Sequence, residues 1–369
     1  MDTERLIVLA AGGTGGHLFP AEALGAVLKE RGYQVILATD HRVEELSTEF
    51  PVQDVLIFSS ASPSSGSLFR KISATFSLGK GILQARRVFK DKKPVAVVGF
   101  GGYPSVPAVF AASMLKIPTV IHEQNAVMGR ANRLLASRVS LIATGFSQVA
   151  RIPEKAPGKP LHTGNPVRPM VCEAANIPYP ELDQTSVLRI LAFGGSQGAR
   201  VLSDVIPDAL ASVPEEKRDR LFITQQARSE DIDRVRHHYK ALGVQSEVSS
   251  FFKDLPKRMA ESHVVISRAG ASTVAELAAI GRPSILIPLP GALDQDQAAN
   301  AAILASANAA TVIIQKDFTA LRLAREISQM LSEPEHLVQQ AEAAKSVGIL
   351  NAADKLADAV ITLIESNSD

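Results

Sequence analysis

Residues 6–17 read Leu-Ile-Val-Leu-Ala-Ala-Gly-Gly-Thr-Gly-Gly-His, and residues 188–199 read Leu-Arg-Ile-Leu-Ala-Phe-Gly-Gly-Ser-Gln-Gly-Ala. Each stretch is an apolar run, a glycine-rich turn and the start of a helix-forming segment. A strand, a glycine loop and a helix N-terminus in this order direct backbone N–H groups and the positive end of a helix dipole at one point, which suits a phosphate. The repeat predicts two similar halves, each opening with an anion-binding loop.

Short β-rich runs alternate with helical patterns on both sides of a loop-like stretch, residues 153–180. The expected strands are 6–9, 35–38, 55–58, 95–98, 119–121, 141–143, 188–193, 221–224, 264–267, 284–287 and 311–314, and the first helix is expected over 20–31. This alternation predicts an α/β chain of two doubly wound Rossmann-like domains whose parallel sheets face a central cleft, the GT-B fold. The expected domains are 1–163 and 164–349, and a terminal helix at about 350–369 can pack back onto the first.

The composition excludes several classes of protein. The 39 basic and 38 acidic residues give a formal charge of +1, whereas a nucleic-acid-binding protein normally carries a basic excess. The single cysteine, Cys172, allows neither an internal disulfide nor a multi-cysteine zinc site. The sequence shows no signal peptide and no apolar run long enough to span a bilayer, so we expect a soluble or peripheral protein of the cytoplasm.

The glycine spacing does not favour a dinucleotide. Neither loop has the G-x-G-x-x-G order of the dinucleotide fingerprint, because Leu18 stands where the first loop would need its third glycine. Asp40 ends the second expected strand where a ribose-binding acid would lie, and it keeps an NAD-dependent oxidoreductase open as an alternative.

A further glycine turn in the second half indicates a nucleotide site. Residues 267–277 read Ser-Arg-Ala-Gly-Ala-Ser-Thr-Val-Ala-Glu-Leu, which predicts a helix start with Glu276 in about its first turn. That carboxylate could accept both hydroxyls of a ribose, or it could be an ordinary dipole-favoured glutamate. Gln297 and Asn300 are spaced to share a helical face and to read sugar hydroxyls. Asp294 and Asp296 spell D-x-D, but we expect no metal and no cofactor.

Six motifs together resemble the MurG family across nearly the whole chain. They are residues 12–17, 101–105, 122–125, 163–168, 194–199 and 268–276. The resemblance implies an inverting hexosyltransferase of peptidoglycan synthesis that moves N-acetylglucosamine from UDP-GlcNAc to the muramyl 4-hydroxyl of lipid I, undecaprenyl-pyrophosphoryl-N-acetylmuramyl-pentapeptide, and so forms lipid II. A UDP-GlcNAc epimerase, which shares the two-lobed fold, is the other alternative.

The family's site residues fall on matching positions of this sequence. The implied donor contacts are Thr14, Gly15, Gly16, Asn125, Arg168, Ser196, Phe252, Ala271, Ser272, Thr273, Val274, Ala275, Glu276 and Gln297. The uracil would lie near Phe252, the ribose on Glu276, and the diphosphate near Ser196 and the helix start at 271–273. The implied acceptor loops contain Gly12, Gly13, Gly101, Gly102, Tyr103 and Ser105, and the acceptor pyrophosphate would lie beside residues 14–16 and 101–105.

His17 is the candidate catalytic base, because an imidazole near its ordinary pKa takes up a proton at neutral pH. The alternative role of His17 is to stabilise its loop or to bind the acceptor phosphate. Glu123 is the competing candidate base, and His122 is expected to be structural.

A basic segment, residues 66–93, combines eight basic side chains and one acidic one with recurring apolar residues. Such an element can bind an anionic membrane surface or pack on the sheet with its charges solvated, and Gly79 and Gly81 are expected to interrupt it. The expected membrane contacts are Ile72, Phe76, Lys80, Ile82 and Arg86. The family resemblance implies a peripheral protein on the cytoplasmic face of the bacterial inner membrane, with cell-wall or division proteins as further partners.

Overall fold

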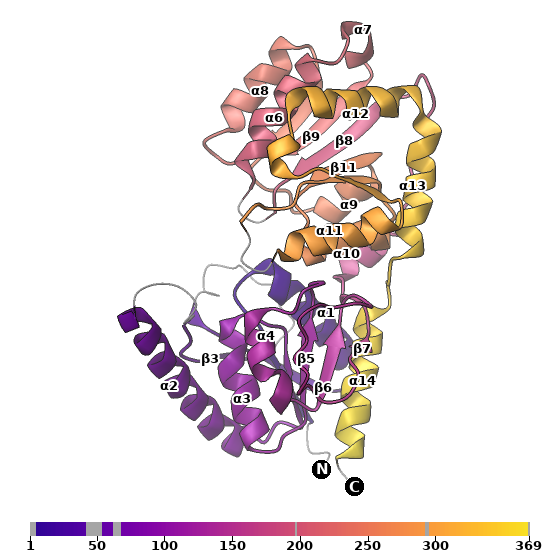
Figure 1. Cartoon of the computed structure of the whole chain (residues 1–369). Coiled ribbons are helices and arrows are strands. Elements are labelled where there is room, and N and C mark those ends of the chain that lie inside the picture. Colours follow the sequence, from indigo (N-terminus) through magenta and orange to yellow (C-terminus); the bar gives the residue numbers. More distant parts are fainter. Residues whose placement is uncertain (1–4, 42–53, 62–67, 196–197, 292–294, 368–369) are drawn as a thin grey trace. The chain divides into compact units, whose positions relative to one another are not determined.

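The computed structural model describes residues 5–41, 54–61, 68–195, 198–291 and 295–367, and the side chains of 68–71 are outside this description. The chain forms two compact units (Figure 1). Unit 1 comprises Met1–Arg168 and Leu350–Asp369, and unit 2 comprises Pro169–Ile349. Each unit is an α/β domain built on a parallel sheet, so the predicted fold class is confirmed.

Unit 1 has a seven-stranded parallel sheet in the order β3-β2-β1-β4-β5-β6-β7. The strands are β1 (Leu6–Ala10), β2 (Gln34–Thr39), β3 (Val55–Ile57), β4 (Ala96–Gly99), β5 (Thr119–Glu123), β6 (Leu141–Thr144) and β7 (Leu161–His162). The helices are α1 (Gly15–Glu30), α2 (Leu68–Lys92), α3 (Val106–Met114), α4 (Arg130–Leu135) and α14 (Ala352–Ser366), with 3-10 turns at Tyr103–Ser105 and Ala136–Arg138.

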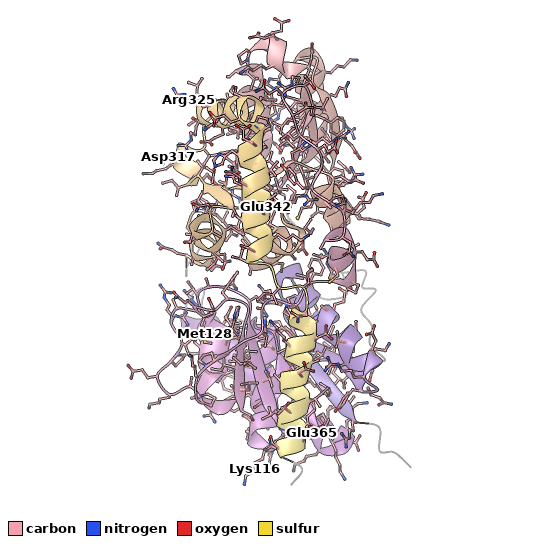
Figure 2. The ribbon with its side chains drawn as sticks, turned by 90° about the vertical axis from the view of Figure 1, so that its right-hand side faces the viewer. Lys116, Met128, Asp317, Arg325, Glu342 and Glu365 are labelled. Carbon is pink, nitrogen blue, oxygen red and sulfur yellow. The ribbon has the colours of Figure 1, made fainter. Side chains whose placement is uncertain are left out.

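Both faces of this sheet are covered. Alternate residues of β1 point to opposite faces: Ile7 and Leu9 pack with α1 and α14, whereas Val8 packs with α2, α3 and α4. Helix α14 is held to α1 by Arg31, which pairs with Asp354 and Asp358. In Figure 2 the Glu365 label marks this helix beside the strands of unit 1.

Unit 2 has a six-stranded parallel sheet in the order β10-β9-β8-β11-β12-β13. The strands are β8 (Leu188–Phe193), β9 (Leu221–Gln226), β10 (Gln245–Ser249), β11 (Val264–Ser267), β12 (Ser284–Leu286) and β13 (Ala310–Val312). The helices are α5 (Pro169–Ala174), α6 (Arg200–Ala211), α7 (Glu215–Arg218), α8 (Ile232–Ala241), α9 (Leu255–Ala260), α10 (Ala271–Ile280), α11 (Asp296–Ser306), α12 (Ala320–Ser332) and α13 (Pro334–Ser346), with a 3-10 turn at Gln315–Asp317.

Two helix predictions were wrong. Helix α1 begins at Gly15 rather than Pro20, because a proline in the second turn removes only one early hydrogen bond and does not prevent the helix from starting before it. Helix α2 runs from Leu68 to Lys92 through both glycines. Only glycine fits at position 81 of this helix, since a Cβ atom there would lie 2.0 Å from the Ser59 carbonyl oxygen. The glycine lets the helix backbone approach that loop.

The sheet order places the loops that carry the predicted site. In unit 1 the strands that follow β1 are added on one side of it, and β4 and the later strands are added on its other side. In unit 2 the same change of direction occurs between β8 and β11, so β1/β4 and β8/β11 are the topological switch points. Ligands of open α/β sheets bind at the carboxyl ends of such strand pairs. The glycine loops after β1 and β8 both stand at these ends.

Candidate active site

The first glycine loop joins β1 to α1 and leaves the helix start without a side-chain cap. Thr14 is the extended N-cap residue, and its carbonyl accepts the N–H groups of His17 and Leu18, each at 3.0 Å. No side chain of the described residues caps the first turn of α1, which begins at Gly15. This terminus therefore has the backbone donors and the positive dipole end that suit an anion.

The loop after β4 packs directly against the first glycine loop. Gly101 and Gly102 have φ angles of +85° and +72°, a conformation that favours glycine. A Cβ atom on Gly102 would lie 3.2 Å from the Cα atom of Gly12, so neither loop has room for a side chain at this contact. Ser105, assigned to the acceptor loop, donates its hydroxyl to the Gly102 carbonyl at 2.9 Å and so fixes the turn itself.

The imidazole of His17 lies between these two loops. A Cβ atom on Gly12 would be 3.1 Å from its Cδ2 atom, and one on Gly101 would be 3.3 Å from its Cε1 atom. The Nδ1 atom is enclosed and has no hydrogen-bond partner among the described residues. Burial lowers the pKa of His17 below its ordinary value, although the nearby Glu123 charge opposes this shift. The ring is thus neutral at neutral pH.

Glu123 ends β5, and hydrogen bonds hold its carboxylate in place. Its Oε1 atom accepts the backbone and side-chain amides of Asn125 at 3.0 and 3.2 Å. Its Oε2 atom accepts the Gly129 N–H at 2.9 Å and the Asn132 side-chain amide at 2.8 Å. These bonds occupy about as many positions as two carboxylate oxygens have lone pairs, so the arrangement suits a fixed negative charge better than a proton acceptor.

His122 is locked in one tautomer. The Gln124 side-chain amide donates to its Nδ1 atom at 3.2 Å, so its Nε2 atom carries the proton and donates to the Gly164 carbonyl at 3.0 Å. Burial lowers the pKa of His122 to about 4. This histidine joins β5 to the segment that follows β7, a structural role that needs no proton transfer.

Arg168 lies beside the first glycine loop. Its guanidinium carbon is 3.9 Å from the centroid of the Phe19 ring, a cation–π contact. The same ring packs on Gly15, where a Cβ atom would come within 2.9 Å of the ring carbon Cε2. The packing of Phe19 therefore holds a cation near the start of α1.

The helix start in unit 2 has the form expected of a phosphate site. Gly270 is the extended N-cap of α10, without a side-chain cap among the described residues. The Ser272 hydroxyl in its first turn is enclosed and has no partner in the described part of the chain. Glu276 is a largely buried sixth residue of the helix, so its predicted place in the first turn was one turn too early.

The two side-chain amides of α11, Gln297 and Asn300, make different contacts. The Gln297 side-chain oxygen accepts the backbone N–H groups of Leu289 and Ala269, at 2.9 and 3.3 Å. Asn300 is fully buried and donates to the Ala269 carbonyl at 3.2 Å. Its amide thus braces the loop after β11, which does not fit the expected reading of a sugar hydroxyl.

Of the remaining predicted site residues, some are described by the structure and two lie outside the described residues. Phe252 is buried and its ring lies 4.4 Å from the Arg258 guanidinium carbon. Asp296 is the first residue of α11, whereas Ser196 and Asp294 lie outside the described residues. Asp40, the residue on which the alternative of an NAD-dependent oxidoreductase depended, is buried and accepts a hydrogen bond from the Ser60 hydroxyl at 2.9 Å.

Helix α2 presents two apolar faces. Leu78 and Phe89 are buried in the core of unit 1, and Ile82 packs against that core. Figure 1 shows α2 beside α3 on that side of the sheet. On the opposite face Ile72, Phe76 and Leu83 are 49%, 77% and 66% exposed. Leu83, rather than the predicted Ile82, is therefore the third exposed apolar residue. No described helix is both long enough and apolar enough to cross a membrane.

Two residues that hold the site together had no sequence signal. Asn132 on α4 donates to the Glu123 carboxylate and to the His122 carbonyl. Gln226 at the end of β9 joins the loop after β8 to the end of β10. Both are single amides outside any motif, and only the tertiary fold brings them to the loops.

Two family models match the chain, the glycosyltransferase family 28 N-terminal domain over residues 7–144 and the corresponding C-terminal domain over 189–359. These two matches, the two Rossmann-like units and the glycine loops at both switch points together define a glycosyltransferase of the GT-B class. A relative from Methylorubrum populi, named UDP-N-acetylglucosamine--N-acetylmuramyl-(pentapeptide) pyrophosphoryl-undecaprenol N-acetylglucosamine transferase, is 54% identical over 96% of both chains. The chain belongs to the MurG family.

Other comparisons agree with this assignment. A relative of the same name from Methylobacterium nodulans is 54% identical over 99% of both chains. The crystal structure of Acinetobacter baumannii MurG matches 97% of this chain and 99% of its own, with a TM-score of 0.78 and 29% identity. The UDP-GlcNAc 2-epimerase from Neisseria meningitidis has a TM-score of 0.66 over 97% of this chain and 100% of its own, but at 14% identity this likeness concerns the fold alone.

Proposed function

We propose that this protein transfers N-acetylglucosamine from UDP-GlcNAc to the 4-hydroxyl of the muramyl sugar of lipid I, which forms lipid II. The observation that carries the proposal is the 54% identity, over 96% of both chains, with a relative named for this transfer. The glycine loops support it, since the reaction brings together two pyrophosphate-bearing substrates. In each unit a helix that starts at the switch point has no side-chain cap among the described residues.

The transfer is a single displacement with inversion. The muramyl hydroxyl oxygen attacks the anomeric carbon, the bond from that carbon to the UDP oxygen breaks, and the hydroxyl proton passes to a base. We assign the base to His17, because its ring is neutral at neutral pH and lies between the two glycine loops of unit 1. UDP leaves as an anion that helix N-termini and positioned cations stabilise.

Glu123 has a supporting role in this mechanism. Its charge favours protonated His17, and its four hydrogen bonds keep that charge in place. We therefore assign Glu123 to stabilising the imidazolium that forms as the hydroxyl loses its proton. His122 and Asn132 hold the end of β5, and so position Glu123.

The units divide the substrates between them. Unit 1, with Thr14, the loop at Gly101 and Gly102, and His17, binds the acceptor pyrophosphate. Unit 2 binds the donor through the start of α10 and the Glu276 carboxylate, which accepts the ribose hydroxyls. Arg168, held on Phe19, adds a positive charge beside the first glycine loop of unit 1.

Helix α2 gives the enzyme access to a lipid-linked acceptor. Its exposed face carries Ile72, Phe76 and Leu83 among exposed basic residues that include Lys80 and Arg87. The expected contact Arg86 is only partly exposed, and its Nε atom is buried. Apolar side chains ringed by cations suit the interface of an anionic bilayer. We propose that this face binds the inner membrane peripherally, from the cytoplasmic side.

Radiolabelled sugar transfer tests the proposal. Purified protein is incubated with labelled UDP-GlcNAc and a short-chain lipid I analogue, with and without EDTA. We expect labelled disaccharide lipid in both reactions. The absence of transfer in both would refute the assignment, and loss of transfer in EDTA alone would restore a metal role for Asp294 and Asp296.

A further inference from the structure

A polar cavity of about 430 Å³ lies at the carboxyl edge of the unit 2 sheet, beside the second glycine loop. Its lining comes from three successive connections: Gly198 after β8, Gln226 and Arg228 at the end of β9, and Ser250 after β10. Apart from Gly198, the sequence motifs did not include these residues. The cavity adjoins the second glycine loop, to which the family resemblance assigns the donor diphosphate.

Gln226 fixes the walls of this cavity. Its Oε1 atom accepts the Gly194 N–H at 3.1 Å, and its Nε2 atom donates to the Ser250 carbonyl at 3.1 Å. The side chain is buried, so both ends of the amide are used inside the protein. The glycine loop and the end of β10 are therefore held at a fixed separation. Arg228 follows Gln226 by two residues in the chain.

Arg228 packs its stem on the glycine loop. A Cβ atom at Gly198 would lie 3.0 Å from the Arg228 Cγ atom, and Gly198 has a φ angle of +65°. The backbone conformation favours glycine at this position, and a larger residue would press on the arginine stem. Arg228 therefore lines the cavity with its stem held against the glycine loop.

The charge of Arg228 is weakly paired. Among the described residues its one ion pair is with Glu230, at 4.0 Å, and the two side chains are 41% and 69% exposed. An exposed pair at this separation contributes little. A guanidinium presents several N–H groups in a plane that matches two phosphate oxygens, so an arriving phosphate competes well for it.

We propose that Arg228 binds the diphosphate of the sugar-nucleotide donor, from the β9 side of the second glycine loop. This inference rests on the proposed function, because it assumes that unit 2 holds the donor. Arg228 then adds a positive charge where the leaving group develops its negative charge.

Calorimetric titration of the full-length protein with UDP, and displacement of UDP by uridine, tests the role of Arg228. The variants are Arg228→Gln, Arg228→Lys and a control, Arg325→Gln, which removes an exposed arginine from α12 (Figure 2). We expect Arg228→Gln to weaken UDP binding about tenfold or more and to leave uridine binding unchanged, because uridine lacks the phosphates. Arg228→Lys should retain part of the affinity, and the control should retain all of it.

The outcomes separate the two proposals. Unchanged UDP affinity in Arg228→Gln would overturn the assignment of Arg228 while leaving the donor site intact. An equal loss of UDP and uridine affinity would also overturn it, because that pattern indicates a distorted cavity and not a lost phosphate contact. If the wild-type protein bound no UDP, the proposed function and this inference would both be refuted.

Discussion

Asn132 donates a 2.8 Å hydrogen bond from its Nδ2 atom to the Oε2 atom of Glu123, and thereby a side chain of α4 fixes the carboxylate at the end of β5. The same Nδ2 atom also donates to the His122 carbonyl at 3.2 Å. A carboxylate this well bonded keeps its place when the charge beside it changes. Such rigidity suits a group that stabilises a neighbouring imidazolium.

His17→Ala should lower kcat about 100-fold or more and leave the KM for UDP-GlcNAc little changed, because a general base acts on the chemical step. Steady-state kinetics with a lipid I analogue measures both constants. His336→Ala, which removes an exposed histidine of unit 2, serves as the control. If kcat of His17→Ala stayed at the wild-type value, His17 would have no place in the proton transfer. Reduced thermal stability with normal kcat would instead support its loop-stabilising role.

Glu123→Gln should shift the acid limb of kcat/KM to lower pH. Glu123 raises the pKa of His17, so removing its charge lowers that pKa further, and the imidazole then stays neutral to a lower pH. The plateau rate should fall as well, since the imidazolium loses its stabilising charge. A pH profile of kcat/KM measures both effects. Complete loss of activity at every pH in a variant that remains folded would favour Glu123 as the base.

Glu276→Ala should raise the KM for UDP-GlcNAc about 100-fold or more, because it removes two hydrogen bonds from ribose hydroxyls to a carboxylate, each contributing roughly 1.5 to 3 kcal/mol. Donor-saturation kinetics measures the change, and binding of 2′-deoxy-UDP provides the complementary test. A normal KM in this variant would contradict the ribose assignment.

Gly81→Ala and Gly79→Ala form a matched pair on α2. A Cβ atom at Gly81 would collide with the Ser59 carbonyl, so this variant should lose about 1 to 3 kcal/mol of stability or more. Nothing lies within 4 Å of a Cβ atom at Gly79, and alanine there should add about 0.5 to 1 kcal/mol through its helix propensity. Denaturant unfolding compares the two. Equal effects of both substitutions would show that the Ser59 contact is unimportant.

Leu83→Ser should weaken binding to anionic vesicles about tenfold, since a buried leucine side chain contributes roughly 1.5 to 3 kcal/mol. Leu321→Ser is the control, because Leu321 on α12 has the same exposure, 66%, as Leu83. Vesicle co-sedimentation measures the binding. High salt should release the wild-type protein, and attachment that resists salt would contradict the electrostatic part of the proposal.

More of the fold than of the site could be predicted from the sequence. Glycine loops and alternating apolar runs reveal parallel sheets because both depend on local pattern. Strand β10 was missed since its residues Gln245–Ser249 are mostly polar and exposed, and β7 because it has only two residues. At the site, motifs indicated His17 and Glu123. Asn132, which bonds Glu123, and Gln226, which holds the second glycine loop, could not be predicted, because they act through contacts that only the folded chain creates.

Helix α14 has a consequence for the order in which the molecule assembles. Its residues Leu356, Ala357, Val360 and Ile364 are buried in the same core as Ile7 and Leu9 of β1. A ribosome makes these residues only after the whole of unit 2. The first domain to emerge therefore waits for the final helix to seal its sheet, and until then it exposes an apolar groove that a chaperone could cover.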